Sequence, residues 1–292
     1  MSRNKATLIG FSAVLLWSLL ALFTVGSAPV PPLLLNAMCF AIGGAIGLVW
    51  VARSGGFGVL RAVPIQVYAF GTAGLFGYHF LYFSALRMAP AAEAGLIAYL
   101  WPLLIVLFSG LLPGERLRPL HIISALIAFA GAALIVAGSG EGARAGALPG
   151  YGLALLCALT WAGYSLISRR LGQVPTAAVA VYCVATAALS GIAHLALEET
   201  VWPVGALGWA ATLALGLGPV GLAFYTWDIG VKRGDIQILG TASYAAPLLS
   251  TLALVLAGMA TASTNLLLAA AMIASGAALA ARASRVGSIK HP

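Results

Sequence analysis

Polar aromatic side chains stand inside long apolar stretches of this 292-residue chain. Buried indole N–H and phenol O–H groups need hydrogen-bond partners or a wet cavity, and their ring faces can stack on apolar or aromatic molecules. Side chains of this kind can bind a small amphipathic molecule. The candidate binding residues are Trp17, Tyr78, His79, Tyr82, Tyr99, Trp101, Trp161, Tyr164, Trp227 and Tyr244.

The spacing of these residues favours binding over catalysis. Tyr78 and Tyr82 are four residues apart, and Trp161 and Tyr164 are three apart, so each pair shares one face of a helix. His79 is included because an ionisable group inside a membrane is a candidate functional residue. It has no obvious partners for a Ser–His pair or a metal cluster, which a membrane-embedded enzyme would need. We therefore expect no catalytic residue, no metal site and no cofactor.

The composition requires that the surface around these residues faces lipid. Hydrophobic residues make up 62% of the chain and charged residues only 8%, with a mean hydropathy of +1.03. Soluble domains carry about 25% charged residues. The net charge of +8 is divided among short clusters between apolar stretches, so nucleic acid is not an expected partner. The sequence also lacks the Gly-x-x-x-x-Gly-Lys-Ser/Thr loop that binds ATP.

Stretches without Asp, Glu, Lys or Arg predict ten transmembrane helices. A bilayer core needs roughly 20 apolar residues per helix, and the first and last stretches are twice that length. Proline residues near 28–32 divide the first stretch, and a turn near 261–265 divides the last. The stretches cover residues 6–52, 62–86, 94–114, 119–140, 145–168, 171–197, 200–227 and 236–281. The predicted fold is therefore an all-α membrane protein.

The positive charges predict how the helices are oriented. Thirteen of the 15 Lys and Arg residues fall in alternate connections, and Arg87 and Arg144 fall in the others. Positive residues collect on the cytoplasmic side of a membrane, so we expect both termini in the cytoplasm. The thirteen are Arg3, Lys5, Arg53, Arg61, Arg116, Arg118, Arg169, Arg170, Lys232, Arg233, Arg282, Arg285 and Lys290.

The two halves of the chain resemble each other at an offset of about 145 residues. Tyr99 and Pro102 correspond to Tyr244 and Pro247 at that offset, as does Gly95 to Gly240, and Trp17 corresponds to Trp161 at 144. Residues 1–144 and 145–292 are therefore predicted to be two five-helix repeats that form one transport domain. Because five is odd, the second repeat enters the membrane from the opposite side. Inverted repeats are a recurrent transporter architecture with the substrate site near the midplane.

Proline residues at matching places in the two repeats indicate where that site lies. Pro102 and Pro247 fall near the centres of predicted helices four and nine. A proline removes one helical hydrogen bond, and a membrane tolerates the break where protein or a cavity supplies another partner. We expect both breaks to border a central cavity, with Gly95 and Gly240 allowing the helices to bend or to approach closely.

Several short motifs resemble those of the YddG-type aromatic amino acid exporters, in the EamA-like group of the drug/metabolite transporter superfamily. The most specific is Tyr99-Leu100-Trp101-Pro102, and the resemblance spans essentially the whole chain. The other motifs are Lys5-Ala6-Thr7-Leu8-Ile9-Gly10, Leu16-Trp17-Ser18, Trp161-Ala162-x-Tyr164 and Gly240-x-x-Ser243-Tyr244-x-x-Pro247. The resemblance implies ten transmembrane helices, a bacterial inner-membrane location and export of aromatic amino acids. The chain departs from the pattern at Tyr78-His79, which leaves the substrate range open.

The resulting hypothesis is an exporter of amino acids with aromatic or other apolar side chains, working by alternating access. Export of drugs or other small metabolites on the same fold stays open, as do an enzyme and a channel from other classes. Sugar nucleotides would require a buried Lys or Arg for their phosphates, and we expect none: Asp228 and Lys232 are predicted to pair at the membrane boundary. The sequence predicts neither the energy coupling nor the oligomeric state.

Overall fold

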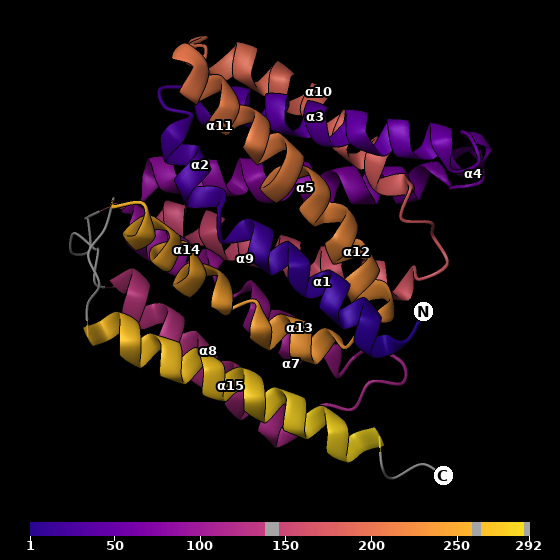
Figure 1. Ribbon diagram of the computed structural model, residues 1–292, viewed down its shortest axis with the longest axis vertical. Helices are drawn as coiled ribbons and strands as arrows, with labels where there is room; N and C mark the ends of the chain where they lie inside the picture. The colour runs from indigo at the N-terminus through magenta and orange to yellow at the C-terminus, as the bar shows by residue number, and fades with distance from the viewer. Residues whose placement is uncertain (138–145, 259–263, 289–292) are drawn as a thin grey trace.

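The computed structural model describes residues 1–137, 146–258 and 264–288, and all regular structure within them is helical. Figure 1 shows these helices running roughly parallel or antiparallel to one another. They are α1 (Arg3–Trp17), α2 (Leu20–Gly26), α3 (Pro32–Arg53), α4 (Gly58–Arg61), α5 (Ile65–Met88), α6 (Ala91–Ala98), α7 (Trp101–Ser109), α8 (Pro119–Ala137), α9 (Leu148–Arg170), α10 (Ala178–Leu197), α11 (Gly205–Leu217), the π-helical turn η1 (Gly218–Leu222), α12 (Ala223–Arg233), α13 (Ile236–Ala242), α14 (Ala245–Leu256) and α15 (Thr264–Ser288).

Within the described residues, six helical segments are long and apolar enough to cross a membrane by their length and composition. They are Arg3–Gly26, Pro32–Arg53, Leu148–Arg170, Ala178–Leu197, Gly205–Arg233 and Ile236–Ala253. Three shorter apolar segments accompany them: Glu93–Ser109, Pro119–Leu134 and Leu267–Ala283. Helix α5 is not in either group although it has 24 residues, because Tyr78, His79 and Tyr82 lower its hydropathy.

Four pairs of helices form the main packing contacts. Helix α1 packs along α12, α5 along α9, α3 along α10 and α8 along α15. In Figure 1 the α8–α15 pair covers one edge of the molecule, and α3 and α10 lie together at the opposite edge. The sequence did not indicate what the fifth and tenth predicted helices contact; in the structure they contact each other. The α1 and α9 helices lie between these two edges.

A glycine pair allows α1 and α12 to cross with their backbones in contact. A Cβ atom on Gly10 would lie 2.7 Å from the Cα atom of Gly230, which is closer than real Cβ contacts. Gly43 of α3 meets Gly221 of η1 in the same way, with a distance of 2.9 Å. Small residues at helix crossings are typical of membrane proteins, where packing and not hydrophobic exclusion holds helices together.

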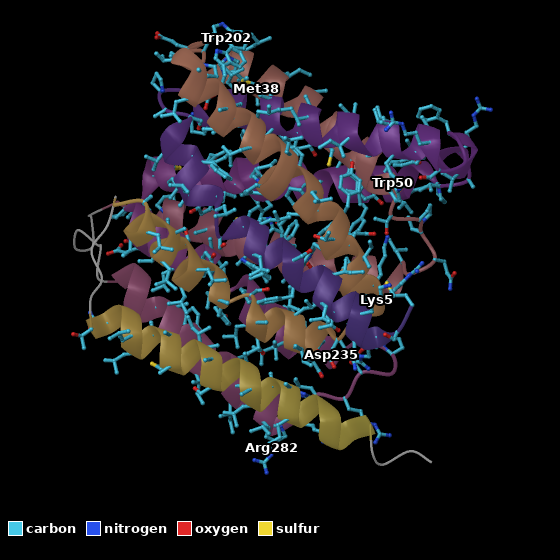
Figure 2. All side chains as sticks on the ribbon, in the orientation of Figure 1. Lys5, Met38, Trp50, Trp202, Asp235 and Arg282 are labelled. Atoms are coloured by element: carbon cyan, nitrogen blue, oxygen red, sulfur yellow. The ribbon has the colours of Figure 1, made fainter. Side chains whose placement is uncertain are left out.

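The first residues of α1 and the last turns of α15 lie on the same side of the molecule (Figure 1). Arg118, just before α8, donates from Nη1 to the carbonyl oxygen of Ala283 in α15 at 3.2 Å on that side. Figure 2 shows Lys5, Trp50 and Asp235 toward this side and Trp202 toward the opposite one. The two ends of the described chain therefore lie on one side of the molecule.

Candidate functional site

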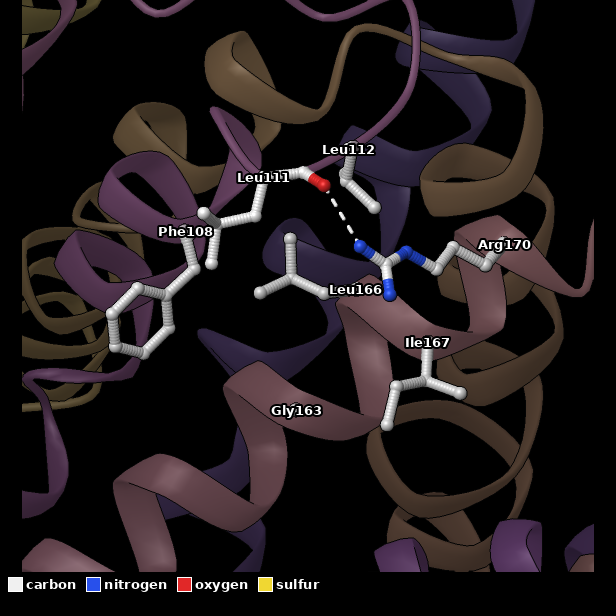
Figure 3. Close-up of a pocket in the computed structure, with 7 residues that line it drawn as sticks. All are labelled: Phe108, Leu111, Leu112, Gly163, Leu166, Ile167 and Arg170. Atoms are coloured by element: carbon white, nitrogen blue, oxygen red, sulfur yellow. Dashed lines mark hydrogen bonds between the residues drawn. The ribbon is translucent and has the colours of Figure 1, made fainter.

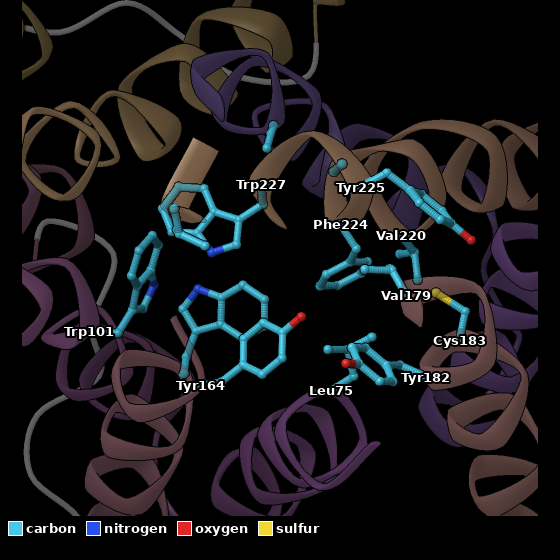
Figure 4. Packing of buried hydrophobic residues seen from close by; sticks show 14 of the residues in the cluster. Leu75, Trp101, Tyr164, Val179, Tyr182, Cys183, Val220, Phe224, Tyr225 and Trp227 are labelled. Atoms are coloured by element: carbon cyan, nitrogen blue, oxygen red, sulfur yellow. The ribbon is translucent and has the colours of Figure 1, made fainter. Parts of the chain in front are cut away.

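Four tryptophans from four different elements meet at the centre of the molecule. Trp17 of α1 lies 6.1 Å from Trp101 of α7, 5.8 Å from Trp161 of α9 and 5.1 Å from Trp227 of α12, measured between ring centroids. Trp101 also packs edge-on against Trp161 and Trp227. Figure 4 shows Trp101, Trp227 and Phe224 directed toward a common centre. We call Trp17, Trp101, Trp161 and Trp227 the tryptophan cluster.

Two indoles of the tryptophan cluster are held by hydrogen bonds. Trp17 Nε1 donates to the carbonyl oxygen of Pro219 at 3.0 Å. Pro219 lies in η1, and a π-helical turn leaves backbone groups outside the regular α-helical pattern. Trp227 Nε1 donates to Ser165 Oγ of α9 at 3.1 Å, and both side chains are fully buried. These two bonds fix the ring orientations without any charged group.

Three candidate residues on α5 lie beside this cluster. Tyr78 packs 5.3 Å from Trp161 and stacks on Tyr82, with a centroid distance of 6.2 Å and an angle of 4° between the ring planes. His79 Nδ1 lies 2.8 Å from the carbonyl oxygen of Leu75. A neutral ring that donates from Nδ1 leaves Nε2 as an acceptor. All three α5 side chains are only half-buried.

Tyr164 of α9 packs against Trp161. Its ring stacks on Trp161 at 5.1 Å and on Phe70 at 5.6 Å, with plane angles of 25° and 22°. Its side chain is fully buried. Tyr164 therefore supports the position of Trp161 through ring packing.

The helices that contain Pro102 and Pro247 are interrupted, as the sequence predicts, but the interruptions precede the prolines. Helix α6 ends at Ala98 and α7 begins at Trp101, while α13 ends at Ala242 and α14 begins at Ala245. Each proline thus stands in the first turn of the second segment, where its missing N–H and fixed φ are tolerated.

Tyr99 and Tyr244, at the two interruptions, belong to a different cluster from the tryptophans. Tyr244 is fully buried against Ala128, Ala132 and Ile273 of α8 and α15, and Tyr99 packs at the edge of this group. The backbone N–H of Leu103 donates to the Tyr244 hydroxyl at 3.0 Å. The tyrosine at the second interruption therefore supplies a partner for the backbone at the first one.

The two glycines before the interruptions differ in their surroundings. A Cβ atom on Gly240 would come within 2.9 Å of Val106 and 3.1 Å of the Pro102 carbonyl oxygen, so this glycine lets α13 cross α7 closely. A Cβ atom on Gly95 would meet only the Tyr82 hydroxyl, at 3.9 Å. Gly240 thus allows α13 to pass close to α7, whereas Gly95 faces the Tyr82 hydroxyl of α5 at an ordinary contact distance.

At one end of the molecule, called here the Glu115 end, charged groups join the elements that carry the tryptophan cluster. Arg3 at the start of α1 contacts Glu115, which follows α7, at 3.2 Å and Asp235, which follows α12, at 3.1 Å. Arg169 at the end of α9 forms an ion pair with Glu115 and donates to two carbonyl oxygens at the end of α12, each at 2.8 Å. The ends of α1, α7, α9 and α12 are therefore tied together.

At the opposite end, called here the Glu198 end, one buried carboxylate joins three other helices. Glu198 follows α10 and accepts from the backbone N–H groups of Leu33 and Leu34 in the first turn of α3 at 3.1–3.2 Å. It also contacts Arg87 of α5 at 2.6 Å and His194 of α10 at 3.0 Å. A carboxylate at a helix N-terminus satisfies free N–H groups and complements the helix dipole. None of α3, α5 and α10 carries a residue of the tryptophan cluster.

A buried ion pair corrects one expectation from the sequence. Asp228 and Lys232 pair at 2.8 Å with side chains that are only 1% and 4% exposed, so the prediction that no Lys or Arg is buried is wrong. Thr176 donates to Asp228 at 2.7 Å, and Lys232 donates to the Val174 carbonyl oxygen at 2.9 Å. The connection between α9 and α10 covers the pair, which a linear sequence does not reveal. Because these groups satisfy one another, Lys232 is not available to a phosphate.

The charged groups that hold helices together at the Glu115 end and at the Glu198 end were not among the candidates predicted from the sequence. Glu115, Glu198 and Asp235 are rare carboxylates in a chain with only seven Asp and Glu, and that rarity was a usable signal. Their partners come from distant positions, so pairing them required the fold. Within residues 1–137, 146–258 and 264–288, no group of three or more His, Cys, Asp or Glu side chains is placed to hold a metal ion.

Comparison with known proteins identifies the family. The model of the EamA-like transporter family matches residues 4–137 and again residues 148–282. The aromatic amino acid exporter YddG of Ancylobacter novellus is 57% identical over 293 residues, which cover 98% of this chain and 100% of that protein. The exporters of the same name from Salmonella typhimurium and Escherichia coli are 27% and 26% identical, over 86% of this chain and 88% of each of them.

A solved crystal structure has the same fold. It is 56% identical in sequence and superposes with a TM-score of 0.92, covering 97% of this chain and 100% of that chain. The helices, their apolar composition and both family matches agree: the chain is a multi-pass membrane protein that belongs to the EamA-like transporter family.

Proposed function

We propose that this protein exports aromatic amino acids across the bacterial inner membrane. The observation that carries the proposal is the tryptophan cluster, in which Trp17 and Trp101 of the first half meet Trp161 and Trp227 of the second. Aromatic rings pair with other rings in stacked or edge-on arrangements, each worth about 0.5–1.5 kcal/mol beyond their buried area. The exporter of Ancylobacter novellus, 57% identical, supports this substrate class.

The half-buried residues on α5 and at the first interruption complete the proposed binding site. Tyr78, His79 and Tyr82 retain accessible surface beside the tryptophan cluster, and Tyr99 does so at the edge of the group around Tyr244. Their hydroxyl groups, the His79 Nε2 atom and backbone groups at the interruptions would bind the ammonium and carboxylate groups of the amino acid. Trp161 and Trp227 would contact its side chain, while Tyr164 and Tyr244 would act by positioning their neighbours.

Ten transmembrane helices in two inverted repeats, 1–144 and 145–292, are part of the proposal. If the halves are matched helix by helix, α1 corresponds to α9, and α5 corresponds to α11 and α12. The α1–α12 contact is then the counterpart of the α9–α5 contact. The same matching pairs α3 with α10 and α8 with α15, so each of these two contacts joins a helix to its own counterpart. This internal symmetry of the packing, and the two separate matches of the family model, support the repeats.

The repeats provide the proposed transport cycle. Two similar halves can adopt two related arrangements, each open to a different side. The ion pairs at the Glu115 end, where both termini would face the cytoplasm by the distribution of positive residues, correspond to an arrangement closed on that side. Breaking these pairs and closing the Glu198 side would give the other arrangement.

Counterflow of labelled phenylalanine in proteoliposomes tests the proposal. We expect saturable exchange, competition by unlabelled tryptophan and tyrosine, and a loss of at least tenfold in exchange for Trp161→Ala. Trp202→Ala is the matched control, because Trp202 is 54% exposed and stacks on Trp209 at the surface, away from the tryptophan cluster. Saturable exchange of phenylalanine that is equal in both variants would show that the tryptophan cluster is not the binding site.

Absence of amino acid exchange by a folded, reconstituted protein would contradict the proposed substrate class. Exporters of drugs or other small metabolites on the same fold would then be tested by the same exchange assay with labelled candidates. An apolar, uncharged binding region suits other aromatic molecules equally well, so this second candidate rests on the same residues.

A further inference from the structure

A hollow of about 210 Å³ opens between α7 and α9 on the outer surface of the molecule (Figure 3). It is separate from the tryptophan cluster, because it is formed by other faces of these two helices. Six of the seven residues that line it carry no polar side-chain group. The lining residues are Phe108, Leu111, Leu112, Gly163, Leu166, Ile167 and Arg170.

The α9 side of the hollow is a continuous stripe. Gly163, Leu166, Ile167 and Arg170 are spaced three, four and seven residues apart, so they lie on one helical face. The stripe is about 10 Å long at 1.5 Å per residue. Gly163 adds no side chain, and a Cβ atom built there would meet nothing within 4 Å. The hollow is therefore an open apolar channel along the helix.

A cation stands at the end of this stripe. Arg170 donates from Nη2 to the carbonyl oxygen of Leu111 at 2.8 Å, as Figure 3 shows. This bond uses one of the five N–H donors of the guanidinium group. Arg170 is exposed, and among the described residues it makes no ion pair with a carboxylate.

The neighbouring residue Arg169 shows that exposure without a carboxylate partner is not a general property of arginines at the end of α9. Arg169 is only 16% exposed and is occupied by Glu115 and by the carbonyl oxygens of Val231 and Gly234. Two adjacent arginines thus point in different directions. Arg169 closes the Glu115 end, and Arg170 leaves its charge beside the apolar hollow.

We propose that the hollow between α7 and α9 binds an anionic phospholipid, with an acyl chain along the stripe and the phosphate on Arg170. An apolar channel that ends in an unpaired cation matches a molecule with an apolar chain and an anionic head. A free phosphate ion would leave the channel empty. The site is distinct from the proposed substrate site and does not depend on which substrate is transported.

Native mass spectrometry of the detergent-purified full chain tests the site. The protein is mixed with equal amounts of phosphatidylglycerol and phosphatidylcholine of the same acyl chains. We expect the wild-type protein to retain phosphatidylglycerol in preference. Arg170→Gln should lower the ratio of the two retained lipids about fivefold, the effect expected for one basic residue at a membrane surface.

Three further variants separate a built site from general charge. Arg53→Gln removes an exposed arginine at the end of α3 and should leave the ratio unchanged. Arg170→Lys keeps the charge and should retain most of the preference. Gly163→Leu fills the channel and should reduce retention of both lipids, with an unchanged circular dichroism spectrum.

Specific outcomes would overturn the proposal. They are equal lipid ratios for the wild-type protein and Arg170→Gln, an equal decrease for Arg53→Gln, or undiminished retention of lipid by Gly163→Leu. Displacement of phosphatidylglycerol by excess inorganic phosphate would show that the site recognises the anion alone and not the lipid.

Discussion

The Glu115 end and the Glu198 end of the molecule are held together by different elements. At the Glu115 end, Arg3, Glu115 and Arg169 join the same four elements that carry the tryptophan cluster. At the Glu198 end, the Glu198 carboxylate joins α3, α5 and α10, which contribute no tryptophan to it. Within the described residues, ion pairs join the tryptophan-bearing elements at the Glu115 end, whereas at the Glu198 end α9 is linked to the start of α6 by a neutral hydroxyl, that of Tyr151, which donates to Glu93.

The two halves of the first broken helix show the same difference. Four residues of α1 are buried on the way to the Glu115 end, and Gly10 lies against Gly230. Helix α2, which leads to the opposite end, has no buried residue. Tight packing and ion pairing therefore coincide at the Glu115 end. Under the proposed transport cycle, the comparison assigns closure of the Glu115 end to the ion pairs that join the elements around the tryptophan cluster.

The largest expected effect comes from separating α1 and α12. Gly10→Ala would place a Cβ atom 2.7 Å from the Gly230 Cα atom, and this nearest atom belongs to the backbone, which cannot move aside as a flexible side chain can. We expect a loss of about 3 kcal/mol in the free energy of unfolding and loss of phenylalanine exchange. Chemical denaturation in detergent measures the first. Gly163→Ala, with open space around its Cβ atom, is the control; equal stability of both variants would contradict the tight crossing.

The next effect comes from removing the charge that the two arginines share. Glu115→Gln leaves Arg169 without its carboxylate, at an expected cost of about 2 kcal/mol to the closed arrangement. Labelling of a cysteine at the buried position Ser109 by a thiol reagent, with the three native cysteines replaced, should become faster. Glu199→Gln, an exposed carboxylate at the other end, should not change the labelling rate. Unchanged labelling in Glu115→Gln would show that the ion pairs do not hold this end closed.

A change at the Glu198 end should lower stability without making the buried position Ser109 more accessible to the thiol reagent. Glu198→Gln removes a charged acceptor from the first turn of α3 and from Arg87. We expect a loss of about 1.5 kcal/mol in the free energy of unfolding, with no faster labelling at Ser109. Faster labelling, comparable to that of Glu115→Gln, would mean that the two ends are coupled directly and that the contrast between them is not functional.

The smallest effect concerns the tryptophan cluster between the ends. Ser165→Ala removes the acceptor of the Trp227 indole N–H, and one buried hydrogen bond contributes about 1 kcal/mol. We expect a small decrease in thermal stability and a higher half-saturating concentration of phenylalanine in exchange. Ser275→Ala, at an exposed position of α15 where the hydroxyl donates to the Met272 carbonyl oxygen of the same helix, serves for comparison. The same half-saturation in both variants would assign Ser165 a purely structural role.

Much of the helical organisation follows from the order of residues. Uncharged stretches set the main helices, and Pro102 and Pro247 mark the interruptions of α6–α7 and α13–α14 to within three residues. Trp17, Trp101, Trp161 and Trp227 were candidates because indoles deep in apolar stretches need partners, and the fold brings these four together. The types and positions of residues along the sequence were sufficient to predict these features.

Features that depend on distant contacts were not predictable. The π-helical turn at Gly218–Leu222 accepts a hydrogen bond from the indole N–H of Trp17, which is 202 residues away in the sequence. Tyr244 resembled a binding residue by its position but is enclosed by α8 and α15. The burial of Lys232 depends on the loop that carries Thr176. In each case a neighbour supplied by tertiary packing, absent from the local sequence, decides the role.

The hydrogen bond from Leu103 to Tyr244 makes the two tyrosines at matching positions, Tyr99 and Tyr244, unequal. Tyr99 holds the matching position in the first half, yet the described residues show no matching bond to it from Leu248, and Tyr99 stays half-buried. Two identical subunits would need one tyrosine to serve both purposes. Under the proposed pair of repeats, a single chain allows Tyr244 to act as a structural brace while Tyr99 keeps accessible surface for the substrate.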